Sequence, residues 1–232
     1  MKPMTSSPLE GHALLGDARA AALVGRDGSV DRLCLRRGPA SSCALLADGP
    51  HEGWRIAPVA PVLASRRRYR GDSPVLETDV DTTEGSLRLV DFVPPRVDAP
   101  GIVRLVEGVR GRVRVRMDLH AAVGGAGLRP LLRHPDASYA AAGSHRVFPG
   151  ASVTADGERL VVRADFVVTA GELVPLVLTW HPPHERVPPP VDPLRALADT
   201  ESYWAERASA GADARGWREA VARSLAPAGA SA

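Results

Sequence analysis

Residues 16–35 restrict the possible folds of this chain more than any other stretch. Two apolar runs, residues 20–24 and 30–35, flank the four residues Gly25-Arg26-Asp27-Gly28. An Asp-Gly pair between apolar runs of strand length predicts a β-hairpin, because the tight turn needs residues that tolerate positive φ. We therefore expect antiparallel β-structure here, against which later strands are laid.

Alternation of apolar and polar side chains indicates further strands. Residues 74–93 are predicted to form a second hairpin, in which Glu77, Asp79 and Asp81 share one face. A third pair is predicted around Gly111, between residues 102–109 and 113–119. The three adjacent arginines at 66–68 cannot share one strand face, which predicts an edge strand or a strand end over residues 62–69. Residues 36–47 lack strand character and are interpreted as a loop.

The number and spacing of these segments define the expected fold class. About a dozen short strands separated by turn signals predict a mainly β protein, a large antiparallel β-sandwich. The prolines between residues 182 and 191 predict a stiff linker. Asp192 and Pro193 then supply an N-cap and a first helical residue, which predicts a helix over residues 192–209. The expected organisation is therefore a β-sandwich (1–181), a Pro-rich linker (182–191) and C-terminal helices (192–232).

Composition excludes several classes of protein. The net charge of +2 argues against a dedicated nucleic-acid surface. The N-terminus lacks the apolar core of a secretory signal, and no apolar run approaches the ~20 residues of a membrane span. Only two cysteines are present, which is not the density of a disulfide scaffold. We expect a cytoplasmic protein that binds no cofactor, no metal, no nucleic acid and no membrane.

Motifs that would indicate chemistry are weak. The glycine-rich residues 124–127 lack the lysine of a phosphate-binding loop. His181 and His184 have a metal-like spacing, but two intervening prolines prevent a shared helical face. The arginine stripe at 112, 114 and 116 could hold an acidic partner, although we favour the solvated face of a sheet. The acids between 77 and 84 are likewise interpreted as a solvated face rather than an acid/base pair.

Several segments in consecutive order resemble one known family. They are ALLGDAR (13–19), ALVGRDGSVD (22–31), LCL (33–35), RRYR (67–70), VLET (75–78), DFVPPR (91–96), LVEGVRG (105–111), LTWHP (178–182) and WREAV (217–221). Together they resemble the N-terminal, trehalase-like domain of glycoside hydrolase family 15, the bacterial glucoamylase- and trehalase-like enzymes. The resemblance implies a β-sandwich that precedes an (α/α)₆ barrel, and the barrel holds both catalytic glutamates. It therefore implies no catalytic residue here, and we expect a non-catalytic domain that lacks its barrel.

Two departures from the family pattern define a candidate interface. Arg32 replaces a tryptophan, and residues 36–41 and 122–127 replace segments that are richer in aromatic and charged side chains. We hypothesise that these two segments face the barrel in full-length relatives. The candidate barrel-facing residues are Arg36, Arg37, Arg129, Trp204, Trp217, Val221 and Leu225. Trp217, Val221 and Leu225 form an apolar stripe on a second predicted helix, which resembles the start of the barrel.

Two other interpretations remain open from the sequence. The chain could be a stand-alone module that binds an α-glucoside or another protein. It could also be half of an enzyme, completed in trans by a separately encoded helical barrel. In the family, the reaction implied by the resemblance is hydrolysis of α-glucosidic bonds.

Overall fold

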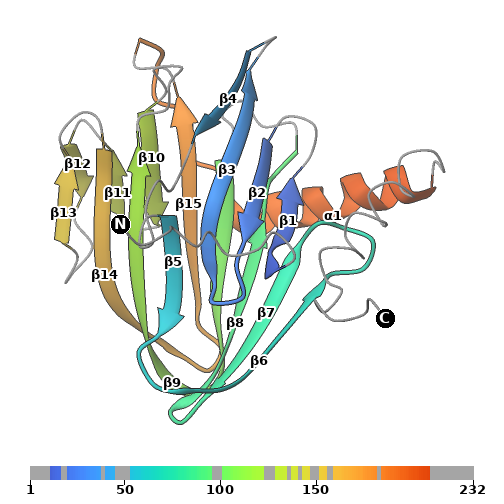
Figure 1. The fold of residues 1–232 in the computed structure, drawn as a ribbon, viewed down its shortest axis with the longest axis vertical. Coiled ribbons are helices and arrows are strands. Elements are labelled where there is room, and N and C mark those ends of the chain that lie inside the picture. Colours follow the sequence, from blue (N-terminus) through green and yellow to red (C-terminus); the bar gives the residue numbers. More distant parts are fainter. Residues whose placement is uncertain are drawn as a thin grey trace, which may run out of the picture.

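The computed structural model describes residues 11–16, 20–37, 40–44, 53–95, 101–122, 129–134, 137–140, 143–146, 152–155, 159–181 and 184–209. Within them the chain is mainly β, with a curled antiparallel sheet and one helix near the C-terminus (Figure 1). The strands are β1 (Ala13–Gly16), β2 (Ala20–Val24), β3 (Ser29–Arg37), β4 (Ala40–Ala44), β5 (Gly53–Pro58), β6 (Val62–Tyr69), β7 (Leu76–Thr82), β8 (Gly85–Phe92), β9 (Gly101–Ala122), β10 (Arg129–His134), β11 (Ala137–Ala140), β12 (Gly143–Arg146), β13 (Ser152–Ala155), β14 (Arg159–Thr169) and β15 (Leu173–His181). The helix is α1 (Pro193–Ser209).

The long strand β9 connects two sets of strands. Its residues 112–122 pair with β14 and, in part, with β5. β5 pairs with β3, which continues to β2 and β1. We call residues 112–122 together with β14, β5, β3, β2 and β1 the first strand set. Its residues 101–111 pair on one side with β8, which continues to β7 and β6. On the other side they pair with β15, which continues to β10. We call residues 101–111 together with β8, β7, β6, β15 and β10 the second strand set. The chain curls between the two sets at the middle of β9.

The hairpin predicted around Gly111 is wrong. The chain continues through this point as one strand of 22 residues. Gly111 has φ +71°, and a Cβ here would lie 2.5 Å from the carbonyl oxygen of Glu84, so the glycine permits close packing on the β7–β8 turn. Opposite β8 the register shifts by one residue, which leaves Val109 as a bulge. A glycine and a bulge bend the strand here without reversing it.

The Asp-Gly hairpin is confirmed. β2 and β3 pair antiparallel, and Gly28 takes φ +80° in the turn. The Asp27 carboxylate accepts hydrogen bonds from the amide and the hydroxyl of Ser29, at 3.1 and 2.6 Å.

By contrast, the loop predicted over residues 36–47 is wrong in part. Arg36 and Arg37 extend β3 and pair with β4, because backbone pairing of the neighbouring strand overrides weak local propensity.

Strands β6, β7 and β8 of the second strand set match the prediction. β7 and β8 form the predicted hairpin, and β6 pairs only with β7 among the described strands, as expected of an edge strand. Leu76 and Val80 face the core, whereas Asp79 carries ion pairs on the opposite face. The sequence reasoning did not predict β10 and β11, whose short segments carry little alternation.

Side chains from both strand sets fill a common core. Val30 and Trp54 from the first set and Leu87 and Trp180 from the second belong to one cluster of buried residues. A second cluster lies on the other face of the second set, where Val90, Phe92, Val103 and Leu105 pack beneath Ala196 of α1. The second strand set is therefore buried on both faces along part of its length.

Helix α1 is confirmed almost residue for residue. The Asp192 carboxylate accepts hydrogen bonds from the amides of Leu194 and Arg195, which is the predicted N-cap. Leu194 is 57% exposed, because Ala196 and Thr200 face the sheet instead. No helix of the described residues is long and apolar enough to cross a membrane. The second predicted helix, which carries Trp217, Val221 and Leu225, lies outside the described residues.

Candidate functional site

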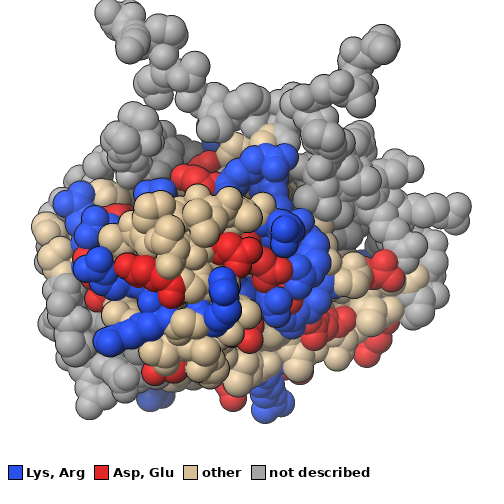
Figure 2. Space-filling model, turned by 90° about the horizontal axis from the view of Figure 1, so that it is seen from below, with Lys and Arg blue, Asp and Glu red and all other residues tan. Residues whose placement is uncertain are grey.

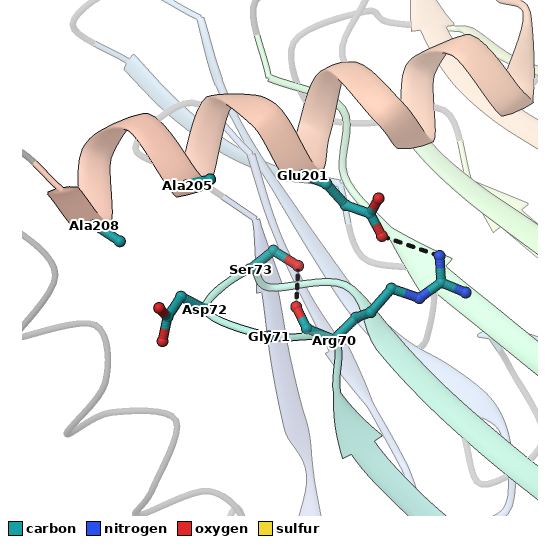
Figure 3. A pocket seen from close by; sticks show the side chains of 7 residues that line it. All are labelled: Arg70, Gly71, Asp72, Ser73, Glu201, Ala205 and Ala208. Carbon is teal, nitrogen blue, oxygen red and sulfur yellow. Dashed lines mark hydrogen bonds and ion pairs between the residues drawn. The ribbon is translucent and has the colours of Figure 1, made fainter.

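A groove separates helix α1 from the turn between β6 and β7. It has a volume of about 670 Å³ and is lined by Arg70, Gly71, Asp72, Ser73, Glu201, Ala205 and Ala208. Figure 3 shows Ala205 and Ala208 on the helical wall and Gly71 and Asp72 on the turn that forms the opposite wall. The volume lies within the range of about 300–1,000 Å³ that is typical of ligand pockets. This groove is therefore a candidate binding site.

The turn that forms one wall is fixed by its own hydrogen bonds. The amide of Arg70 donates to the carbonyl of Val75 at 2.9 Å, and the amide of Ser73 donates to the carbonyl of Arg70 at 3.2 Å. The Ser73 hydroxyl donates to the same Arg70 carbonyl at 2.6 Å. Gly71 takes φ +58°, the left-handed conformation that glycine adopts at low cost. The wall is therefore preformed.

Arg70 connects this turn to the helix. Its guanidinium donates to the Glu77 carboxylate at 2.8 Å and to the Glu201 carboxylate of α1 at 3.0 Å. Partial burial disfavours the charged guanidinium, but the hydrogen bonds to Glu201 and Glu77 outweigh it, so that the pKa of Arg70 is raised. This contact holds Glu201 of α1 against the turn.

Apolar contacts fix the first turns of α1 on the sheet. Ala196 and Thr200 are buried, and Val191 and Leu197 pack against the cluster beneath the helix. The segment before the helix is also held, because Arg133 of β10 donates hydrogen bonds to the carbonyls of Pro188 and Pro189. The predicted linker is thus fastened to the sheet at these residues. These contacts fix the path of residues 188–197 along the sheet.

A buried ion pair lies at the centre of the fold. Arg104 of β9 is 0% exposed and donates to both oxygens of Asp91, at 2.8 and 3.2 Å. The same guanidinium donates to the carbonyl of Trp54 at 2.6 Å and to that of Gly28 at 2.7 Å. It therefore joins the second strand set to β5 and to the Asp-Gly turn of the first. All three nitrogens of the guanidinium donate hydrogen bonds, which marks Arg104 as structural.

The exposed faces of the sheet carry charges of both signs. Figure 2 shows basic and acidic side chains interspersed over the end of the molecule that is lowest in Figure 1. On the second strand set, Asp79 pairs with Arg68 and Arg88, both at 2.6 Å. On the first, Arg116 of the arginine stripe pairs with Asp165 at 2.8 Å. The arginine stripe is therefore a solvated face with counter-charges, as the sequence favoured. The prediction of a solvated acidic face on the hairpin is wrong for Glu77, which is buried and paired with Arg68 and Arg70.

The structure places the candidate barrel-facing residues on separate elements. Arg36 and Arg37 lie near the end of β3, opposite Ser41 and Ala40 of β4, and Arg129 begins β10. Trp204 lies on α1, half-buried, with its ring 5.4 Å from that of Tyr203 in an edge-to-face arrangement. Trp217, Val221 and Leu225 lie outside the described residues. The proposed common interface stays a prediction.

Neither the groove nor the buried ion pair was predicted from the sequence. The ion pair had a signal, because Asp91 and Arg104 each occupy an apolar-face position in an alternating strand. The groove had no such signal in the sequence, since its two walls are about 130 residues apart in the chain.

Comparison with known proteins adds no assignment: no protein-family model and no curated protein matches this chain.

Proposed function

We propose that this chain is the non-catalytic N-terminal β-sandwich domain of a glycoside hydrolase family 15-like protein. Its role is to hold a helical catalytic domain, in cis or in trans, rather than to cleave substrate. In the proteins that it resembles, two glutamates of the helical barrel hydrolyse α-glucosidic bonds. A cytoplasmic location belongs to the same proposal.

The observation that carries the proposal is the way in which α1 is fastened to the β-structure. The buried residues Ala196 and Thr200, the Arg70–Glu201 ion pair and the hydrogen bonds from Arg133 all act on one short segment. A helix held at several points along the exit of the chain supports a role in positioning a domain attached beyond it. A flexible tether would need none of these contacts.

Two further features are consistent with a sandwich that carries no chemistry of its own. The two strand sets share β9, and their side chains meet in one core, as the two sheets of a sandwich do. Among the described residues, the carboxylates of Glu77, Asp79, Asp91 and Glu201 are each engaged by arginines. At Asp79 burial opposes the charged carboxylate, but hydrogen bonds from Arg88 and Arg68 outweigh it and lower the pKa of this group.

The test is the activity of the purified chain. We expect incubation with trehalose or maltose to release no more glucose than buffer does. Release that coincides with the protein peak from a sizing column would overturn the non-catalytic assignment. Titration calorimetry with the same sugars separates the alternative function. Saturable heat would identify a stand-alone sugar-binding module, whereas we expect none.

A further inference from the structure

Strand β6 ends the curled sheet on the side of the second strand set. Among the described strands it pairs only with β7, and Figure 1 shows no described strand on its far side. The strand is eight residues long, and its residues are exposed or half-buried. Natural proteins usually shorten or cover such an edge, because its backbone groups can pair with a further strand. The open edge of β6 is therefore a candidate interaction surface.

The turn after β6 shows which backbone groups point to the open edge. The amide of Arg70 donates to the carbonyl of Val75 at 2.9 Å, so the backbone of Arg70 is directed toward the β7 side. In an antiparallel pair, every second residue of a strand directs its backbone groups to the same neighbour. The amides and carbonyls of Ser65 and Arg67 therefore point away from β7. No described strand pairs with them.

The charges on β6 restrict which strand the edge can accept. The strand holds three arginines and no acid. Arg66 is exposed and makes no ion pair with any residue that the structure describes, whereas Arg68 is paired with Glu77 and Asp79. A second copy of this chain would bring three more arginines to the same short edge, where like charges repel. An acidic strand would instead meet opposite charge.

The start of β6 adds apolar surface to the edge. Val62 and Leu63 are 52% and 67% exposed. Leu63 is the extra residue at a shift of register against β7. A strand laid along the edge would cover part of this apolar surface, which favours association. A segment that combines acidic and apolar residues therefore fits the edge.

We propose that the open edge of β6 binds an extended acidic segment of a partner protein, which joins the sheet as a further strand. The backbone groups of Ser65 and Arg67 hydrogen-bond the backbone of this segment, and one of its acidic side chains pairs with Arg66. Backbone pairing supplies affinity, and charge selects the partner. The inference goes beyond the proposed function, because it concerns a partner other than the helical domain.

Amide exchange of the full chain, followed by NMR, tests the proposal with a defined probe. The probe is a peptide of alternating valine and glutamate, eight residues long like β6. Saturating peptide should slow exchange of the Ser65 and Arg67 amides at least about tenfold. The amides of Arg66 and Arg68, which are directed to β7, should change little. A peptide with lysine in place of glutamate should bind at least about tenfold more weakly.

Two variants separate backbone pairing from charge. Ser65→Pro removes an amide that points away from β7, so it should keep the sheet but lower the affinity for the glutamate peptide at least about tenfold. Ser65→Ala is the matched control, because it keeps the amide and should bind the peptide as the unmodified protein does. Arg66→Gln should remove most of the preference for glutamate over lysine, while Ser65 and Arg67 are still protected at saturation.

Several results would overturn the proposal. These are failure of the glutamate peptide to bind, binding that leaves the Ser65 and Arg67 amides unprotected, and equal binding by folded Ser65→Pro. Protection that grows with the concentration of the protein alone would assign the edge to a second copy, which also contradicts the proposal. Neither sugar nor a helical domain takes part, so the outcome is independent of the glucose-release test.

Discussion

The buried guanidinium of Arg104 gives the sharpest test of how this fold is held together. Arg104→Met removes the partner of Asp91, whose side chain is 1% exposed. Breaking a buried ion pair by deleting one member costs about 3–5 kcal/mol, because the remaining charge is left without compensation. The carbonyls of Trp54 and Gly28 also lose donors at 2.6 and 2.7 Å, so we expect the upper part of this range.

Chemical unfolding measures the effect. Since single domains are stable by about 5–15 kcal/mol, the Arg104→Met protein should unfold at much lower denaturant, or fail to fold. The double variant Arg104→Met/Asp91→Leu keeps the experiment decisive, because an apolar pair of similar volume should recover at least half of the loss. A change smaller than about 1 kcal/mol in Arg104→Met would refute the reasoning.

A matched control separates burial from charge. Arg116→Met breaks the exposed pair with Asp165, whose two side chains are 57% and 52% exposed. Water and salt screen such a pair, so the unfolding midpoint should stay close to that of the unmodified protein. If Arg104→Met and Arg116→Met lowered the unfolding midpoint equally, burial of the Arg104 ion pair would not contribute to the stability of the fold.

Three further predictions concern the edges of the fold. Tyr69→Phe removes a hydroxyl that accepts a hydrogen bond from the amide of Leu14 at 3.0 Å and donates one to its carbonyl at 2.9 Å. The unfolding free energy should fall by about 1–2 kcal/mol, and amide exchange in β1 should become faster. Glu201→Gln weakens the half-exposed pair with Arg70, so it should cost less than about 1 kcal/mol but accelerate exchange in α1. Burial opposes ionisation of Asp79, but hydrogen bonds from two arginines outweigh it and lower the pKa of Asp79 below the ordinary 3.8. The charged carboxylate therefore stabilises the fold fully above pH 3.8. This stabilisation is lost as the pH falls through the lower folded-state pKa. The difference in stability between the unmodified protein and Asp79→Asn should therefore shrink on acidification below pH 4, and a difference that stays constant with pH would contradict this.

Local signals account for the parts of the fold that the sequence predicted. Asp27 and Gly28 define a tight turn, and Asp192 with Pro193 defines a helix start, because each signal acts within a few residues. β9 failed for the opposite reason. Whether the chain reverses or only bends at Gly111 depends on pairing with β8 and β14, which the residues next to Gly111 do not reveal.

The candidate site was less predictable than the fold. Arg70 and Glu201 meet across 131 residues, and neither residue carries a motif that announces the contact. The pairing of Asp91 with Arg104 could have been anticipated, because two opposite charges on apolar faces of alternating strands need each other. The barrel-facing role of Arg36, Arg37 and Arg129 came from the resemblance alone and stays a prediction.

Complementation of a helical catalytic domain is a direct test of whether this chain supports such a domain. The helical domain of a glycoside hydrolase family 15 enzyme, produced without its own β-domain, is titrated with this chain while glucose release from trehalose and maltose is measured. We expect no release by the chain alone and a rate that rises to a plateau as the chain is added. Activity of the chain alone, or a rate unchanged by any concentration of the chain, would contradict it.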